Sequence, residues 1–118
     1  MNHINQSKLT PPPIVFKIVW PILYFLMIFS YLLYIQNSDN FSFIFFIQLF
    51  LNFLWILIYF KFHKLLLSFI IILCLIIAII LNIISFYKIN HLSAYLLLPY
   101  LFWTIFASYL NWYIFINN

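Results

Sequence analysis

Residues 98–111 read LPYLFWTIFASYLN and lie within the last apolar stretch of the chain, 94–116. A helix rises about 1.5 Å per residue, so a stretch of this length can cross the hydrocarbon core of a bilayer. Trp103, Ala107 and Asn111 are spaced four residues apart, which places an indole, a small residue and an amide on one side of that helix. Lipid offers no hydrogen-bonding partner for an amide, so we expect Asn111 to face another helix or a cavity.

Composition restricts the class of protein before any motif does. Of 118 residues, 69% are hydrophobic and 25% are aromatic, whereas only 5% are charged. These values lie outside the range of soluble domains and predict an integral membrane protein that is surrounded by the lipid bilayer. The net charge of +4 comes from dispersed lysines, which are too few to form a nucleic-acid-binding patch. The single cysteine, Cys74, cannot form a disulfide within the chain.

Four apolar stretches are separated by short polar turns. They predict an all-α bundle of four membrane-spanning helices, at about 13–35, 41–60, 65–87 and 92–116. We assign 13–118 to one transmembrane domain and 1–12 to a polar amino-terminal segment with a proline run. The first stretch is too long for the apolar region of a signal peptide and is followed by no small-residue cleavage site, so we expect it to stay in the membrane.

Local signals refine these spans. Asn40 and Asn90 are placed to cap the second and fourth helices. Pro21 and Pro99 are expected to bend the first and the last helix. The third span is almost entirely Ile and Leu, so we expect it to face mainly lipid.

The lysines predict the orientation of the bundle. With four spans, Lys8, Lys17, Lys61 and Lys64 lie on one side of the membrane, and Lys88 alone lies on the other. Because basic residues are enriched in cytoplasmic segments, both termini are predicted to be cytoplasmic.

Two further helical stripes carry candidate ligand-binding residues. Trp20 and Tyr24 share one side of the first span, and Gln48, Asn52 and Trp55 share one side of the second. Two amides at this depth are unfavourable unless they are satisfied, so they are either interhelical hydrogen-bonding residues or ligand contacts. The tryptophans near span ends are either residues of the interfacial aromatic belt or ligand contacts.

The sequence contains few residues that could support catalysis or bind a metal. The only carboxylate side chain is that of Asp39 in a turn, and no Cys–His or Ser–His–Asp set is present. His3, His63 and His91 lie outside the spans and far apart, so we predict no metal site, no catalytic residue and no axial haem ligand. Ion-coupled transport is disfavoured because no span contains an acidic residue.

Three segments together resemble a known family. They are Pro12-Pro13 with Val15-Phe16 and Val19-Trp20; Gln48-Leu49 with Leu51-Asn52 and Trp55; and Pro99-Tyr100 with Trp103, Phe106-Ala107 and Leu110-Asn111. In this order and spacing they are similar to the TspO/MBR family of translocator or tryptophan-rich sensory proteins. The resemblance extends over nearly the whole chain. It implies a protein of the bacterial inner membrane whose helical bundle binds tetrapyrroles such as protoporphyrin IX or haem, without a required cofactor.

The resemblance also implies site residues. The family's pocket positions correspond to Trp20, Asn52, Trp55, Trp103, Ala107, Leu110 and Asn111, and the stripes described above add Tyr24 and Gln48 to this candidate set. Some family members are reported to promote light-dependent breakdown of porphyrins. Such an activity would depend on indoles, here those of Trp20 and Trp103, and would be the one enzymatic role open to this chain.

The chain also departs from the family pattern. Family members have five helices, and the spans here correspond to helices two to five, so the polar stripes are expected to lack one covering neighbour. A second copy, a partner helix or the ligand would then cover them, and a homodimer is the simplest arrangement. No basic residue follows Leu110-Asn111, so a cholesterol-specific role is not supported. The alternative functions are a structural or regulatory subunit that docks a partner helix, and a family member that no longer binds ligand.

Overall fold

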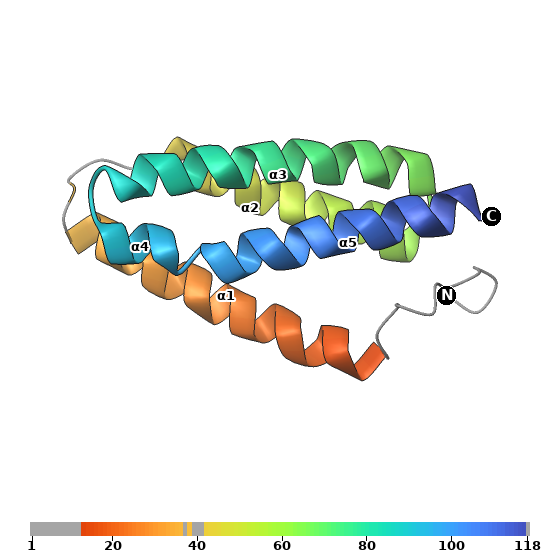
Figure 1. Ribbon diagram of the computed structural model, residues 1–118, viewed down its shortest axis with the longest axis horizontal. Helices are drawn as coiled ribbons and strands as arrows, with labels where there is room; N and C mark the ends of the chain where they lie inside the picture. Colours follow the sequence, from red (N-terminus) through yellow and green to blue (C-terminus); the bar gives the residue numbers. More distant parts are fainter. Residues whose placement is uncertain (1–12, 37, 39–41, 118) are drawn as a thin grey trace.

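The computed structural model describes residues 13–36, 38 and 42–117, with side chains from residue 18 onward. Its elements are α1 (Pro13–Gln36), α2 (Phe43–Ile56), the π-helical turn η1 (Leu57–Lys61), α3 (Leu65–Tyr87), α4 (His91–Tyr95) and α5 (Leu98–Ile116) (Figure 1). Within these residues four stretches are long and apolar enough to cross a membrane, namely Ile18–Gln36, Phe43–Lys61, Leu65–Tyr87 and His91–Ile116. The predicted all-α fold class with four spans is confirmed.

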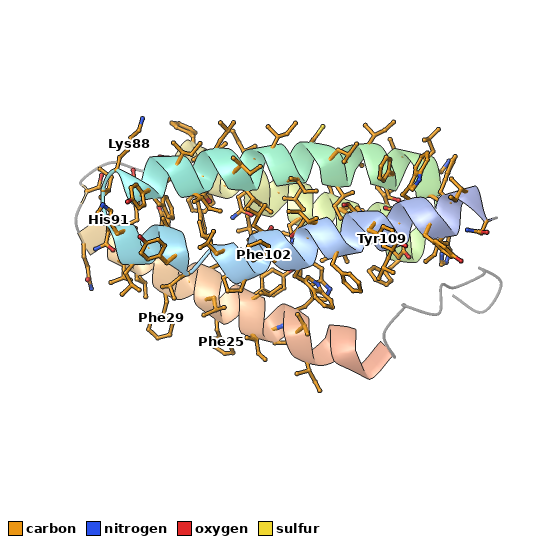
Figure 2. The ribbon with its side chains drawn as sticks, in the orientation of Figure 1. Phe25, Phe29, Lys88, His91, Phe102 and Tyr109 are labelled. Atoms are coloured by element: carbon orange, nitrogen blue, oxygen red, sulfur yellow. The ribbon has the colours of Figure 1, made fainter. Side chains whose placement is uncertain are left out.

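The helices form an elongated bundle, 48 Å in its longest dimension, in which α3 lies along one side (Figure 1). α3 packs against α2, α4 and α5, whereas α1 packs most closely against α4. The amino-terminal half of α1 diverges from α5 (Figure 1). Phe25, Phe29 and Phe102 point away from the bundle (Figure 2) and are largely exposed, as expected for an outer surface that faces lipid.

Reciprocal hydrogen bonds fix the carboxyl-terminal half of α1. Ser30 Oγ donates to the Ser93 carbonyl at 2.6 Å, and Ser93 Oγ donates to the Ser30 carbonyl at 2.6 Å. Two serines at the contact allow the backbones of α1 and α4 to approach closely. One turn further along, the rings of Tyr34 and Phe86 stack at 4.4 Å between centroids.

Polar side chains begin two of the helices. Ser42 Oγ accepts from the Phe45 backbone amide at 3.3 Å and caps α2, while the predicted cap at Asn40 lies outside the described residues. Asn90 Oδ1 accepts from the Ser93 amide at 3.0 Å, which confirms the cap predicted at the start of the last span.

The last predicted span, 92–116, is divided into two helices. α4 ends at Tyr95 and α5 begins at Leu98, with Pro99 in the first turn of α5. Proline has no amide hydrogen, so the Tyr95 carbonyl loses its helical donor, and the chain instead forms a tight turn from the Leu97 amide to the Ala94 carbonyl at 3.0 Å. Instead of the bend expected at Pro99, the helix is interrupted between Tyr95 and Leu98. By contrast, α1 continues through Pro21.

The connection from α2 to α3 departs from regular helix. In η1 the Phe62 amide bonds to the Leu57 carbonyl at 3.3 Å, five residues back, which widens the last turn of the span. This turn places the buried Tyr59 ring in a stack with Trp55 at 5.1 Å. His63 then adopts a positive φ of 55°, the left-handed conformation that reverses the chain before α3 in a sequence without glycine.

The third span, which is expected to face mainly lipid, is buried along one side. Ser68, Ile72, Leu75, Ala78, Ile79, Asn82 and Phe86 of α3 are buried. The reason is that α3 packs against α2, η1, α4 and α5, while its outer side is as apolar as its inner side. Because the sequence of α3 is almost uniformly apolar, it does not indicate which side of the helix is packed.

Asn82 provides a test of this packing. It is fully buried, and neither Nδ2 nor Oδ1 has a hydrogen-bond partner among the described residues. A buried polar group without a partner costs about 1–3 kcal/mol, so we expect Asn82→Leu to raise the free energy of unfolding by about that amount. The measurement is circular dichroism during SDS titration of the protein in mild detergent.

Asn52→Leu is the matched control, because that amide makes hydrogen bonds to Tyr24 and Tyr100 and its loss should destabilise the protein. A destabilised Asn82→Leu variant would contradict the assignment of Asn82 as an unsatisfied amide.

Candidate ligand-binding site

A chain of hydrogen bonds connects α1, α2 and α5 inside the bundle. Tyr24 Oη donates to Asn52 Oδ1 at 2.6 Å, and Asn52 Nδ2 donates to Tyr100 Oη at 3.0 Å. Tyr100 Oη donates to Gln48 Oε1 at 2.8 Å, and Gln48 Nε2 contacts the Met27 sulfur at 3.7 Å. All donors point in the same direction along this chain, so each bond polarises the next. The two amides of α2 therefore hold α1 and α5 in place.

A second hydrogen-bonded group centres on the Asn111 amide. Its Oδ1 accepts from Trp55 Nε1 at 3.0 Å and from Ser68 Oγ at 2.9 Å. Its Nδ2 donates to the Leu65 carbonyl at 3.0 Å. The expectation that Asn111 faces another helix is confirmed, and this residue joins α5 to both α2 and α3.

Three indoles from three helices meet beside these polar groups. The Trp20 ring of α1 lies 6.1 Å from Trp55 of α2 and 6.4 Å from Trp103 of α5, measured between ring centroids. The first pair is tilted at 44° and the second is edge-to-face at 86°. Tyr24 stacks on Trp20 at 6.0 Å. We call Trp20, Trp55 and Trp103 the indole cluster.

The indole cluster contains a buried donor. Trp20 Nε1 is buried and has no acceptor among the described residues, whereas Trp55 Nε1 bonds to Asn111. A buried donor without an acceptor is unfavourable by about 1–3 kcal/mol. The cluster therefore combines flat apolar rings with the N–H group of Trp20, which an acceptor on a ligand could satisfy.

A shallow hollow of about 290 Å³ lies on the outer side of α1. Pro21, Tyr24, Phe25 and Ile28 line it, and its lining is almost entirely apolar. Phe25 points outward there (Figure 2). We do not place the site in this hollow, because the hydrogen-bonded amides and the other indoles lie on the inner side of α1.

The structure brings most of the predicted site residues together. All of them except Ala107 and Leu110 belong to the indole cluster or to the two hydrogen-bonded groups, and these two are buried on α5 near Asn111. Thr104 and Ser108, which flank the predicted stripe, bond back to carbonyls of their own helix at 2.8 and 2.7 Å.

Sequence reasoning missed Tyr100 and Ser68 as site residues, and it placed Met27 beside the site without predicting its contact with Gln48. Tyr100 lies one helical turn before Trp103, so extending the stripe of the last span by one turn would have found it. Ser68 and Asn82 are two heptads apart on α3, and two polar residues at that spacing in an Ile/Leu-rich span indicate a packed side. Met27 follows Trp20 and Tyr24 at helical spacing, so it continues their stripe on the first span.

The expectation that the polar stripes lack a covering neighbour is wrong for the described bundle. Gln48, Asn52 and Asn111 are fully buried within a single chain, and Trp55 and Ala107 are nearly so. The partners come from side chains on the other helices, which an analysis of each stripe alone could not identify. A second copy is therefore not needed to cover these amides.

Comparisons with known proteins identify one family that the chain matches. The sequence model of the TspO/MBR family matches residues 1–116 of the chain. The chain is 41% identical over 121 positions to the tryptophan-rich protein TspO of Archaeoglobus fulgidus, an alignment that covers 98% of this chain and 77% of the relative. It is 31% identical over 123 positions to the tryptophan-rich protein TspO of Bacillus cereus, covering 99% of this chain and 79% of that relative.

The hydroxyl of Tyr100 can be tested directly. Tyr100→Phe keeps the ring but removes the group that joins Asn52 to Gln48, so two buried amides each lose a partner. We expect the free energy of unfolding to fall by about 1–3 kcal/mol in SDS titrations. Tyr109→Phe is the matched control, because Tyr109 is exposed on the same helix and should tolerate the change. Equal stability of Tyr100→Phe and the wild type would rule out the proposed role of the hydroxyl.

Proposed function

Because this chain belongs to the TspO/MBR family, we propose that this integral membrane protein is a sensor or regulator that binds a tetrapyrrole, protoporphyrin IX or haem. The proposed site is the indole cluster together with Tyr24. The observation that carries the proposal is the convergence of three indoles from three different helices.

The chemistry of the cluster suits a flat macrocycle. A tetrapyrrole presents two broad apolar faces, and an aromatic contact contributes about 0.5–1.5 kcal/mol beyond the buried area. Trp20 meets its neighbours at 44° and 86° rather than face to face. A macrocycle can therefore exchange these indole–indole contacts for stacked ones, and a carbonyl or carboxylate of the ligand can accept from Trp20 Nε1.

The placement of α1 supports the same site. Its carboxyl-terminal half is fixed to α4 through Ser30 and Ser93, whereas the half that carries Trp20 diverges from α5 (Figure 1). The rings that must separate to admit a ligand thus lie where α1 is least closely packed.

Cationic groups lie near this end of the bundle. Trp55 precedes Lys61 by six residues, which is roughly 9 Å along a helix. Lys61 and Lys64 are exposed in the connection between α2 and α3. Carboxylates at the edge of a tetrapyrrole that stacks on the indole cluster can reach these ammonium groups or the interfacial water around them.

The alternative role as a subunit that docks a partner helix has weaker support. That hypothesis used the polar stripes as the docking surface, and their amides are buried and hydrogen-bonded within the chain. Self-association stays a prediction of the family resemblance. Light-dependent porphyrin breakdown at Trp20 and Trp103 likewise stays a prediction.

We also propose that both termini are cytoplasmic in a bacterial inner membrane. Lys61 and Lys64 precede the first residue of α3, and Lys88 follows its last residue. Figure 2 labels Lys88 at that far end. Among the described side chains the excess of lysine is therefore at the end that carries the α2–α3 connection. Labelling of single cysteines introduced at Lys64 and Lys88 in intact cells tests this orientation. Labelling of Lys64→Cys by an impermeant reagent would contradict it.

The indoles provide the direct test of tetrapyrrole binding. Trp20→Ala and Trp103→Ala should each weaken protoporphyrin IX binding by roughly two- to twelvefold, the factor equivalent to one lost aromatic contact. Membrane insertion should not change, because it depends on the summed apolarity of a span. The measurement is quenching of tryptophan fluorescence during titration of protoporphyrin IX in nanodiscs.

Trp112→Ala is the matched control. Trp112 is 44% exposed and contacts Phe69 and Phe115 away from the indole cluster. An equal loss of affinity in Trp112→Ala and Trp103→Ala would place the ligand elsewhere. Absence of saturable quenching in the wild type would rule out the proposed function.

A further inference from the structure

α3 contributes one polar side chain to the surroundings of the indole cluster. Ser68 is fully buried, and its Oγ lies 2.9 Å from Asn111 Oδ1 and 2.9 Å from the Leu65 carbonyl. A hydroxyl has one proton, so Ser68 shares it between these two acceptors. Ile72 and Leu75, which follow on the same side of α3, are apolar.

The chemistry of the partners determines the orientation of the Asn111 amide. Trp55 Nε1 can only donate, and the Leu65 carbonyl can only accept. Turning the amide over would set its NH₂ group against the indole N–H and its oxygen against the carbonyl oxygen. Asn111 Oδ1 must therefore face Trp55, and Ser68 donates to that same oxygen.

Through this arrangement Ser68 influences the orientation of an indole in the cluster. Asn111 Oδ1 accepts from both Ser68 Oγ and Trp55 Nε1, so the hydroxyl restrains the acceptor to which the indole is bonded. The bond to Asn111 limits rotation of the Trp55 ring, which lies 6.1 Å from Trp20 and stacks on Tyr59. The angle that Trp55 presents to Trp20 thus depends on a serine of a different helix.

We infer that Ser68 is a positioning residue of the tetrapyrrole site, acting through Asn111 to hold the indole of Trp55. Its effect on ligand affinity rests on the proposed function, whereas its effect on the indole rests on the hydrogen bonds alone. The inference gives α3 a part in the site through a residue that neither the stripes nor the family resemblance identified.

The first readout is the indole N–H of Trp55. The four tryptophans give four indole resonances in ¹H–¹⁵N correlation spectra, and Trp55→Phe assigns the one that belongs to Trp55. Ser68→Ala should shift this resonance upfield and accelerate its exchange with solvent about fivefold, the factor equivalent to one net hydrogen bond. Ser68→Thr keeps a hydroxyl and should restore the wild-type position.

Two further variants control for general packing effects. Ser85→Ala removes a half-buried hydroxyl from the same helix and should leave the Trp55 resonance unchanged. Ser68→Cys is close to serine in size but donates weakly, so its shift should be intermediate. The resonance of Trp112, which lies outside the indole cluster, should stay unchanged and reports that each variant is folded.

The second readout is affinity for protoporphyrin IX in nanodiscs. Ser68→Ala should bind about fivefold more weakly than the wild type, and Ser68→Thr should recover the affinity. An unshifted Trp55 resonance in Ser68→Ala overturns the inference, and so does a shifted resonance with unchanged affinity. If the wild type shows no saturable binding, the proposed function fails and the site role of Ser68 falls with it, while the resonance still decides whether Ser68 positions Trp55.

Discussion

An amide inside a bilayer has no water to bond, so it is unfavourable unless its hydrogen bonds are made within the protein. Asn52 meets this constraint with Tyr24 of α1 and Tyr100 of α5. Asn111 meets it with Trp55 of α2 and with Ser68 and a backbone carbonyl of α3. The partners come from different helices in each case. Satisfying the amides therefore fixes how the four spans lie against one another.

The same hydrogen bonds give the three indoles different freedom. Trp55 is tied to Asn111, whereas Trp20 Nε1 has no acceptor among the described residues. The side-chain hydrogen bonds of its helix are made further along the chain, by Tyr24 to Asn52 and by Ser30 to Ser93. Interhelical hydrogen bonds in membranes contribute about 0.6–2 kcal/mol each, so several are needed to hold a helix. A frame of hydrogen-bonded helices with one adaptable indole suits a site that exchanges ring contacts with a flat ligand.

Length and apolarity predicted the four spans, because these are the properties that a bilayer selects. The helical spacing of residues such as Trp103 and Asn111 also predicted which side of the last span is buried. It could not predict the partners, since Tyr100 and Ser68 meet the amides only through the packing of separate helices. For the same reason the buried side of α3 was missed, and Pro99 indicated a bend without showing that the helix stops.

The account rests on the proposal that a tetrapyrrole binds against Trp20, Trp55 and Trp103. The most direct test is to measure nuclear Overhauser effects between bound protoporphyrin IX and the indole protons in nanodiscs. We predict cross-peaks from the meso protons of the macrocycle to the rings of these three residues and none to Trp112, which lies on the outer surface. Saturable binding with cross-peaks to Trp112 but not to the indole cluster would contradict the account.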